Sequence, residues 1–163
     1  MAIRSALNAL ALLSTNNTTI KESIVQNGGI QTTLDFLTPP NEEVLVDSGL
    51  RLLNELAKDN HKNLAALKSA GLKELITAEM EKNTESPQIM SSCFSMLRHV
   101  NPKDSLEAKR IVIMALDTLK RHPSDANVQL EGSQALLHIM LLFPEVSTDI
   151  QSGLVSTLTL DRS

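Results

Sequence analysis

Few residues of this chain could carry out covalent or metal chemistry. The sequence holds one cysteine and four histidines, and no motif places a base or an orienting group beside Cys93. It also has no glycine-rich phosphate loop, no His-Glu-x-x-His metal motif and no nucleophile elbow. We therefore expect a protein that is not an enzyme, with no catalytic residue and no cofactor.

Two of the histidines, His99 and His138, fall at equivalent positions of an internal repeat, so their side chains could approach each other. Imidazole is a common metal ligand. However, no acid or thiol completes a site at the matching positions, and Ser95 and Gln134 are poor metal ligands. The sequence therefore predicts no metal site. A pH-dependent role in partner binding is the better interpretation, because histidine titrates at about pH 6.5.

The composition excludes several classes of protein. The chain has 163 residues and a formal net charge of −4, and 42% of its residues are hydrophobic but only 2% aromatic. An aliphatic chain of this kind favours helices over sandwiches or barrels. Without a basic surface or stacking rings it is poorly suited to nucleic acid, so no nucleic-acid partner is expected. A single cysteine excludes an intrachain disulfide and a multi-cysteine zinc site.

The sequence gives no sign of membrane insertion or export. No stretch approaches the roughly 18 unbroken apolar residues of a membrane helix, so no membrane span is expected. Segment 6–13 is short for a signal peptide and is interrupted by Asn8. A lone cysteine does not point to secretion. These features favour a cytoplasmic location, with the nucleus as the alternative.

Helical periodicity runs along nearly the whole chain. Turn-forming residues interrupt it at 27–29, 38–41, 70–71, 86–87, 101–102, 123, 144 and 152–153. The segments between them are about 8–15 residues long, the usual length of a helix. A glycine between two short helices, as at 28–29 and 71, predicts a sharp turn with positive φ. Segment 105–120 has no glycine, so there we expect two helices that are fused or bent differently.

A nine-residue frame recurs along these segments. It is clearest at 49–57 and returns at 6–14, 93–101 and 132–140, at intervals of about 40 residues. The first position is always small, the fifth is always leucine and the eighth is always aliphatic. The small residues are Ala6, Gly49, Cys93 and Gly132.

The small first position predicts close contacts between helices. Glycine inside a helix costs about 1 kcal/mol relative to alanine. We therefore expect Gly49 and Gly132 to lie where another helix crosses too closely for a side chain. Cys93 occupies the same position, which indicates a buried structural thiol with a raised pKa and little reactivity.

This pattern resembles the armadillo repeat, in which a short helix, a Gly-Gly-Ile turn, a second helix and a third helix follow one another. The third helix of that family reads Ala-x-x-Ala-Leu-x-Asn-Leu-Ala. The matching residues here are Asn17, 28–30, 34–37, 59–60, 71–72, 128–129 and 135–136. The resemblance spans nearly the whole chain and implies an all-α fold, a right-handed α-solenoid of armadillo-type three-helix repeats.

The resemblance also sets the expected domain organisation. Residues 1–163 would form a single armadillo-type solenoid of about three and a half repeats. Solenoid ends normally carry polar caps, whereas the last segment reads Leu154, Val155, Leu158 and Leu160. This apolar end predicts that the chain is a fragment of a longer array.

In armadillo arrays the third helices line a concave groove that binds extended peptides or partner helices. The importin-α and β-catenin families place Trp and Asn there, at frame positions three and seven, but this chain has no such ladder. Those positions, with residues one turn earlier on the same helix faces, predict a polar groove of mixed charge. The candidate groove residues are Arg4, Asn8, Asp47, Arg51, Glu55, Ser91, Ser95, His99, Gln134 and His138.

The function expected from the sequence is that of a non-catalytic protein-protein interaction module that binds a partner peptide or helix along this groove. One alternative is a structural scaffold segment that stacks on neighbouring repeats or self-associates through apolar solenoid ends. Another is a regulatory region of a larger multidomain protein. An ordinary solvated helix face remains the simplest alternative for the polar strip itself.

Overall fold

A computed structural model describes residues 2–38 and 42–148. Within these ranges the chain is helical and has no strand, which confirms the predicted all-α class. The helices are α1 (Ala2–Ser14), α2 (Thr18–Gln26), α3 (Gly29–Leu37), α4 (Glu43–Ala57), α5 (His61–Ser69), α6 (Leu72–Lys82), α7 (Pro87–Leu97), α8 (Ser105–Arg121) and α9 (Ala126–Leu142). No described helix is both long enough and apolar enough to cross a membrane.

Polar caps fix where several helices begin. Asn17, Asn60, Asp104 and Asp125 each accept a hydrogen bond from a backbone N–H three residues further along the chain. Such a bond satisfies one of the donors that the first turn of a helix leaves free. Pro87 opens α7, where its missing N–H costs nothing.

Two glycines make the sharp turns between the short paired helices. Gly28 precedes α3 with φ of 77°, and Gly71 precedes α6 with φ of 94°. Residues with a Cβ rarely adopt this left-handed conformation. Both turns confirm the prediction made from the glycine positions.

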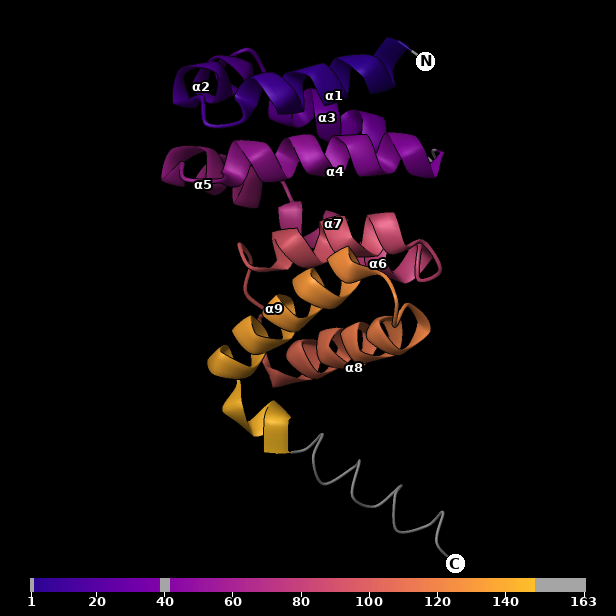
Figure 1. Cartoon of the computed structure of the whole chain (residues 1–163). Helices are drawn as coiled ribbons and strands as arrows, with labels where there is room; N and C mark the ends of the chain where they lie inside the picture. Colours follow the sequence, from indigo (N-terminus) through magenta and orange to yellow (C-terminus); the bar gives the residue numbers. More distant parts are fainter. Residues whose placement is uncertain (1, 39–41, 149–163) are drawn as a thin grey trace, which may run out of the picture.

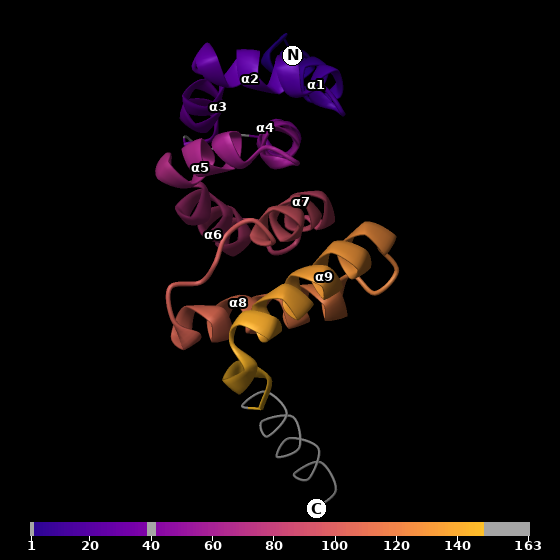
Figure 2. The ribbon, with the colours of Figure 1, turned by 90° about the vertical axis from the view of Figure 1, so that its left-hand side faces the viewer.

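The helices form two layers. The helices that carry the nine-residue frame, α1, α4, α7 and α9, follow one another along one side of the molecule, and we call them the row helices (Figures 1 and 2). Each row helix packs on the next one. The pairs α2–α3 and α5–α6, and the single helix α8, lie on the other side (Figure 2). Segment 105–120, for which the sequence predicts two helices that are fused or bent differently, lies within the single helix α8 of 17 residues.

The frame positions form much of the core between the layers. The leucines at the fifth position of α4, α7 and α9 are buried, and so are the aliphatic residues at the eighth position of these three frames. One difference concerns α7, which ends at Leu97 rather than continuing to Asn101. Pro102 prevents the helix from including Asn101, because the residue before a proline is disfavoured in a helix. The frame predicts that His99 lies on this helix. In the structure it lies instead in the turn after α7.

Two glycines of the row helices lie at close helix crossings, as predicted. A Cβ at Gly49 would stand 2.8 Å from Cδ2 of Leu37 on α3. At Gly132 it would stand 2.9 Å from Cδ2 of Leu119 on α8 and 3.1 Å from Cε2 of Phe94 on α7. Ala6, at the same frame position of α1, is exposed because no described helix covers it. The predicted apolar end at 154–160 lies outside the described residues.

The crossing at Gly132 yields a test of stability. Gly132→Leu should lower the free energy of unfolding by about 2–3 kcal/mol, because the new side chain overpacks the contact with Leu119 and Phe94. Urea unfolding followed by circular dichroism measures the change. Ala65→Leu, on the exposed face of α5, adds a similar side chain to open space and should be near neutral. A near-neutral Gly132→Leu would contradict the close crossing.

Candidate functional site

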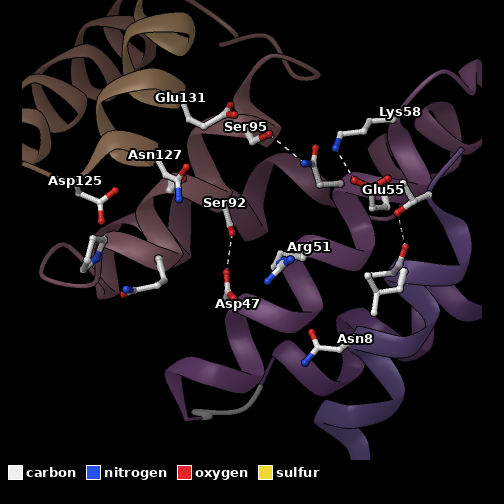
Figure 3. Close-up of a pocket in the computed structure, with 17 residues that line it drawn as sticks. Asn8, Asp47, Arg51, Glu55, Lys58, Ser92, Ser95, Asp125, Asn127 and Glu131 are labelled. Atoms are coloured by element: carbon white, nitrogen blue, oxygen red, sulfur yellow. Dashed lines mark hydrogen bonds and ion pairs between the residues drawn. The ribbon is translucent and has the colours of Figure 1, made fainter.

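A polar cleft of about 750 Å³ opens between the row helices (Figure 3). Its walls come from α1, α4 and α7 and from the beginning of α9. The lining residues are Asn8, Ala11, Leu12, Thr15, Asp47, Arg51, Asn54, Glu55, Lys58, Pro87, Gln88, Ser91, Ser92, Ser95, Asp125, Asn127 and Glu131. This volume lies within the range of ligand-binding clefts.

The cleft brings together six of the ten residues that the sequence nominates. These six are Asn8, Asp47, Arg51, Glu55, Ser91 and Ser95. The other four, Arg4, His99, Gln134 and His138, do not line it. The prediction works best on α4, where Asp47, Arg51 and Glu55 follow at intervals of four residues and therefore share one face.

The disagreement is concentrated on α9. The sequence nominates Gln134 and His138, but the cleft is lined instead by Asp125, Asn127 and Glu131. Figures 1 and 2 show that α9 runs obliquely to α7, so its first turns reach the cleft and its later turns lead away from it. The other missed residues include Asn54 and Lys58 on or beside α4 and Ser92 on α7. The only sequence signal for these is that they are polar and flank the nominated positions.

Hydrogen bonds between neighbouring row helices fix part of the cleft wall. Ser92 Oγ of α7 donates to Asp47 Oδ1 of α4 at 2.8 Å. Asn54 Nδ2 of α4 donates to Ser95 Oγ of α7 at 3.0 Å. These bonds join side chains 45 and 41 residues apart in the sequence. They tie α4 to α7 through polar groups at the edge of the apolar core.

Arg98 makes the equivalent link between α7 and α9. Its guanidinium donates to the side-chain oxygen of Gln134 and forms an ion pair with Glu131, with Nη2 3.0 Å from Oε2. Nη2 also donates to Ser95 Oγ at 3.1 Å. Gln134 and Glu131 thus both hold Arg98 from α9, but only Glu131 also lines the cleft.

The cleft still offers groups that have no partner in the described part of the chain. Arg51 is exposed, and no described residue bonds to its guanidinium. Asn54 Oδ1 is a buried amide oxygen that accepts no hydrogen bond from the described residues. By contrast, Glu55 is paired with Lys58 at 2.5 Å. An anionic group of a ligand could therefore bind Arg51 without breaking an existing contact.

Cys93 lies away from solvent and is fully buried, as the sequence predicts. Burial raises the pKa of its thiol far above the usual range, and the nearby Glu79 and Asp47 carboxylates raise it further. A thiol in this state is a poor nucleophile because it does not form thiolate near neutral pH.

The two nominated histidines lie close enough to influence each other. Burial lowers the pKa of His99, and the charges of Arg98, Lys68, Lys58 and His138 lower it further. The titration of His99 is therefore moved below the ordinary value that the sequence interpretation assumes. Among the described residues, no cluster of three or more histidine, cysteine or acidic side chains could hold a metal ion.

No family model, no curated protein and no solved structure matches the chain. The protein is therefore described by its own fold and cleft. In its described ranges the chain is all-helical, and its row helices frame a polar cleft of mixed charge.

The burial of Cys93 predicts its reactivity. Because it is the sole cysteine, a thiol reagent such as Ellman's reagent reports on this position alone. In the folded protein at pH 8 we expect labelling to be at least a hundredfold slower than in urea, where the thiol is exposed and has its ordinary pKa. Equal rates in the two states would contradict a buried thiol.

The lowered pKa of His99 predicts a dependence of stability on pH. Between the folded pKa and the unfolded value of about 6.5 the unfolded state binds more protons. The free energy of unfolding should therefore fall as the pH is lowered from 7.5 to 5. His99→Gln should reduce the slope of this fall in urea titrations at several pH values. His61→Gln, at an exposed position, should leave the slope unchanged; identical slopes for all three proteins would contradict the shift.

Proposed function

We propose that the chain is an armadillo-type array and acts as a non-catalytic protein-binding module whose polar cleft receives an extended segment of a partner. The observation that carries this proposal is the convergence of polar side chains from four row helices on one cleft. Six of these residues are nominated from the sequence, four at positions three and seven of the nine-residue frame and two, Asp47 and Ser91, one turn earlier.

The arrangement of helices supports the armadillo part of the proposal. The frame recurs in α1, α4, α7 and α9, and these helices pack in that order. Leu37 of α3 covers Gly49, and Leu119 of α8 covers Gly132, so the second layer meets the row at equivalent frame positions. The last repeat departs from the three-helix pattern because α8 replaces a pair of helices.

The chemistry of the cleft suits the main chain and charged side chains of a peptide. The amide groups of Asn8 and Asn127 can both donate and accept hydrogen bonds. Arg51 can bind a carboxylate through two parallel hydrogen bonds. Asp47 and Asp125 add negative charge at other places on the wall. We therefore expect a partner segment with an acidic residue opposite Arg51 and a basic or polar residue near Asp125.

Preorganisation supports tight binding by such a cleft. The walls are helices, and the bonds from Asp47 to Ser92 and from Asn54 to Ser95 hold α4 and α7 together before any ligand arrives. Binding then loses less conformational entropy than it would on mobile loops.

The proposal is tested by selecting ligands and locating them on the surface. A phage library of random 12-residue peptides is panned against the full chain, and the affinity of an enriched peptide is measured by fluorescence anisotropy. The double variant Arg51→Ala with Glu55→Ala should weaken binding at least tenfold, which corresponds to about 1.4 kcal/mol. Circular dichroism should show unchanged helix content, because both residues lie at the surface of α4.

A matched control uses another Arg–Glu pair. Arg110 of α8 and Glu81 of α6 form an exposed ion pair in the other layer, with 2.5 Å between Nη2 and Oε1. Arg110→Ala with Glu81→Ala removes the same charges outside the cleft and should leave the affinity unchanged. A peptide that loses equal affinity in both variants, or in neither, would contradict binding in the cleft. The absence of any enriched peptide would do the same.

A further inference from the structure

The last row helix presents an uncovered stripe of leucines. Leu130, Leu137 and Leu141 of α9 are 55%, 61% and 72% exposed. Their spacing of seven and four residues places them on one face of the helix. Scattered exposed leucines are normal on a protein surface, but an aligned apolar row on one helix marks an interaction site.

The repeat shows what this face does in the other row helices. Leu137 stands at frame position six, where α4 has Asn54 and α7 has Arg98. Asn54 bonds to α7 and Arg98 bonds to α9, so position six faces the following row helix. The leucine stripe of α9 is therefore the face on which a further row helix would stack. No described residue covers it.

The first row helix is uncovered on the opposite face. Frame positions one, four and eight of α1 are Ala6, Ala9 and Leu13, and all three are exposed, Leu13 by 58%. The corresponding residues of α4, α7 and α9 are all buried. These are Gly49, Leu52, Leu56, Cys93, Met96, Val100, Gly132, Ala135 and Ile139. At these positions a row helix contacts the elements that precede it: Gly49 meets Leu37 of α3, and Gly132 meets Leu119 of α8 and Phe94 of α7.

An apolar hollow lies beside this face of α1. It has a volume of about 430 Å³ and is bounded by α1, α2 and α3 and by Leu52 of α4. Most of its lining is aliphatic or aromatic, including Ile3, Leu10, Ile24 and Phe36. A hollow of this chemistry takes up a side chain such as leucine at the expense of water. The leucines of α9 supply side chains of this type.

We propose that the chain self-associates head to tail, with the leucine stripe of α9 in one copy packing on the exposed face of α1 in a second copy. Helices α1 and α9 lie at opposite ends of the row (Figures 1 and 2), so the two faces meet only between molecules. The contact continues the stacking already present in α1–α4, α4–α7 and α7–α9. Both faces are apolar, which makes a second copy the occupant that matches each of them.

This contact joins two different faces and leaves one of each kind free at the ends of the assembly. Such a heterologous contact does not close at a dimer. The mean mass should therefore rise steadily with protein concentration. The polar cleft is not part of the contact, so the inference holds or fails independently of peptide binding.

The experiment uses one charge on each face of the full chain. In sedimentation velocity between 1 and 200 µM, the parent should shift from monomer to larger species. Leu137→Glu blocks the α9 face and Leu13→Glu blocks the α1 face, so each variant alone should stay monomeric. An equimolar mixture of the two should form a dimer and no larger species, because each supplies the face that the other lacks. Val44→Glu, at an exposed position of α4, should associate like the parent.

The outcomes separate the alternatives. A parent that is monomeric throughout this range overturns the proposal, and it would mean that another part of the chain or a different protein covers the faces. Association of either single variant overturns the head-to-tail geometry, since it requires contact between like faces. A mixture that stays monomeric overturns it as well. If circular dichroism shows that Leu13→Glu has lost helix, Ala9→Arg and Leu130→Glu repeat the test on the same two faces.

Discussion

The close stacking of the row helices is the constraint on which the rest of the structure depends. It requires a small residue where a side chain of the second layer packs against a row helix. Leu37 packs in this way against Gly49, and Leu119 against Gly132. A helix accepts glycine there at a cost of about 1 kcal/mol relative to alanine. The cost is offset by burial of the leucines that reach over it, because each buried leucine contributes about 2 kcal/mol. The small residue that recurs in the sequence repeat therefore reflects this recurring close contact.

The same stacking explains why the cleft is polar. Apolar frame positions point into the core between the layers, so the edges at which row helices meet are left to residues such as Asp47 and Asn54. Their bonds to α7 satisfy groups that are partly withdrawn from water. Arg51, on the same face of α4, has no such partner in the described chain and is therefore available to a ligand.

Position six of the frame shows how one register can serve two purposes. Asn54 and Arg98 use it for polar contacts with the next row helix, whereas Leu137 exposes an apolar side chain there. Polar contacts inside the row fix the register, because a buried donor or acceptor tolerates little displacement. An apolar contact at the end is less directional and suits association that depends on concentration. The proposed binding in the cleft and the proposed stacking at the ends would thus use different faces of the row helices.

The sequence by itself determined the all-helical class, the glycine turns, the crossings at Gly49 and Gly132 and the burial of Cys93. These follow from local rules of periodicity, backbone conformation and size. It also nominated the cleft residues of α4, since spacing of four places side chains on one helix face. Only the tertiary structure decided that Asp125 rather than His138 lines the cleft, because the direction of α9 depends on its packing against α7 and α8. Crossing angles are set by many contacts at once, and no local pattern of residues encodes them.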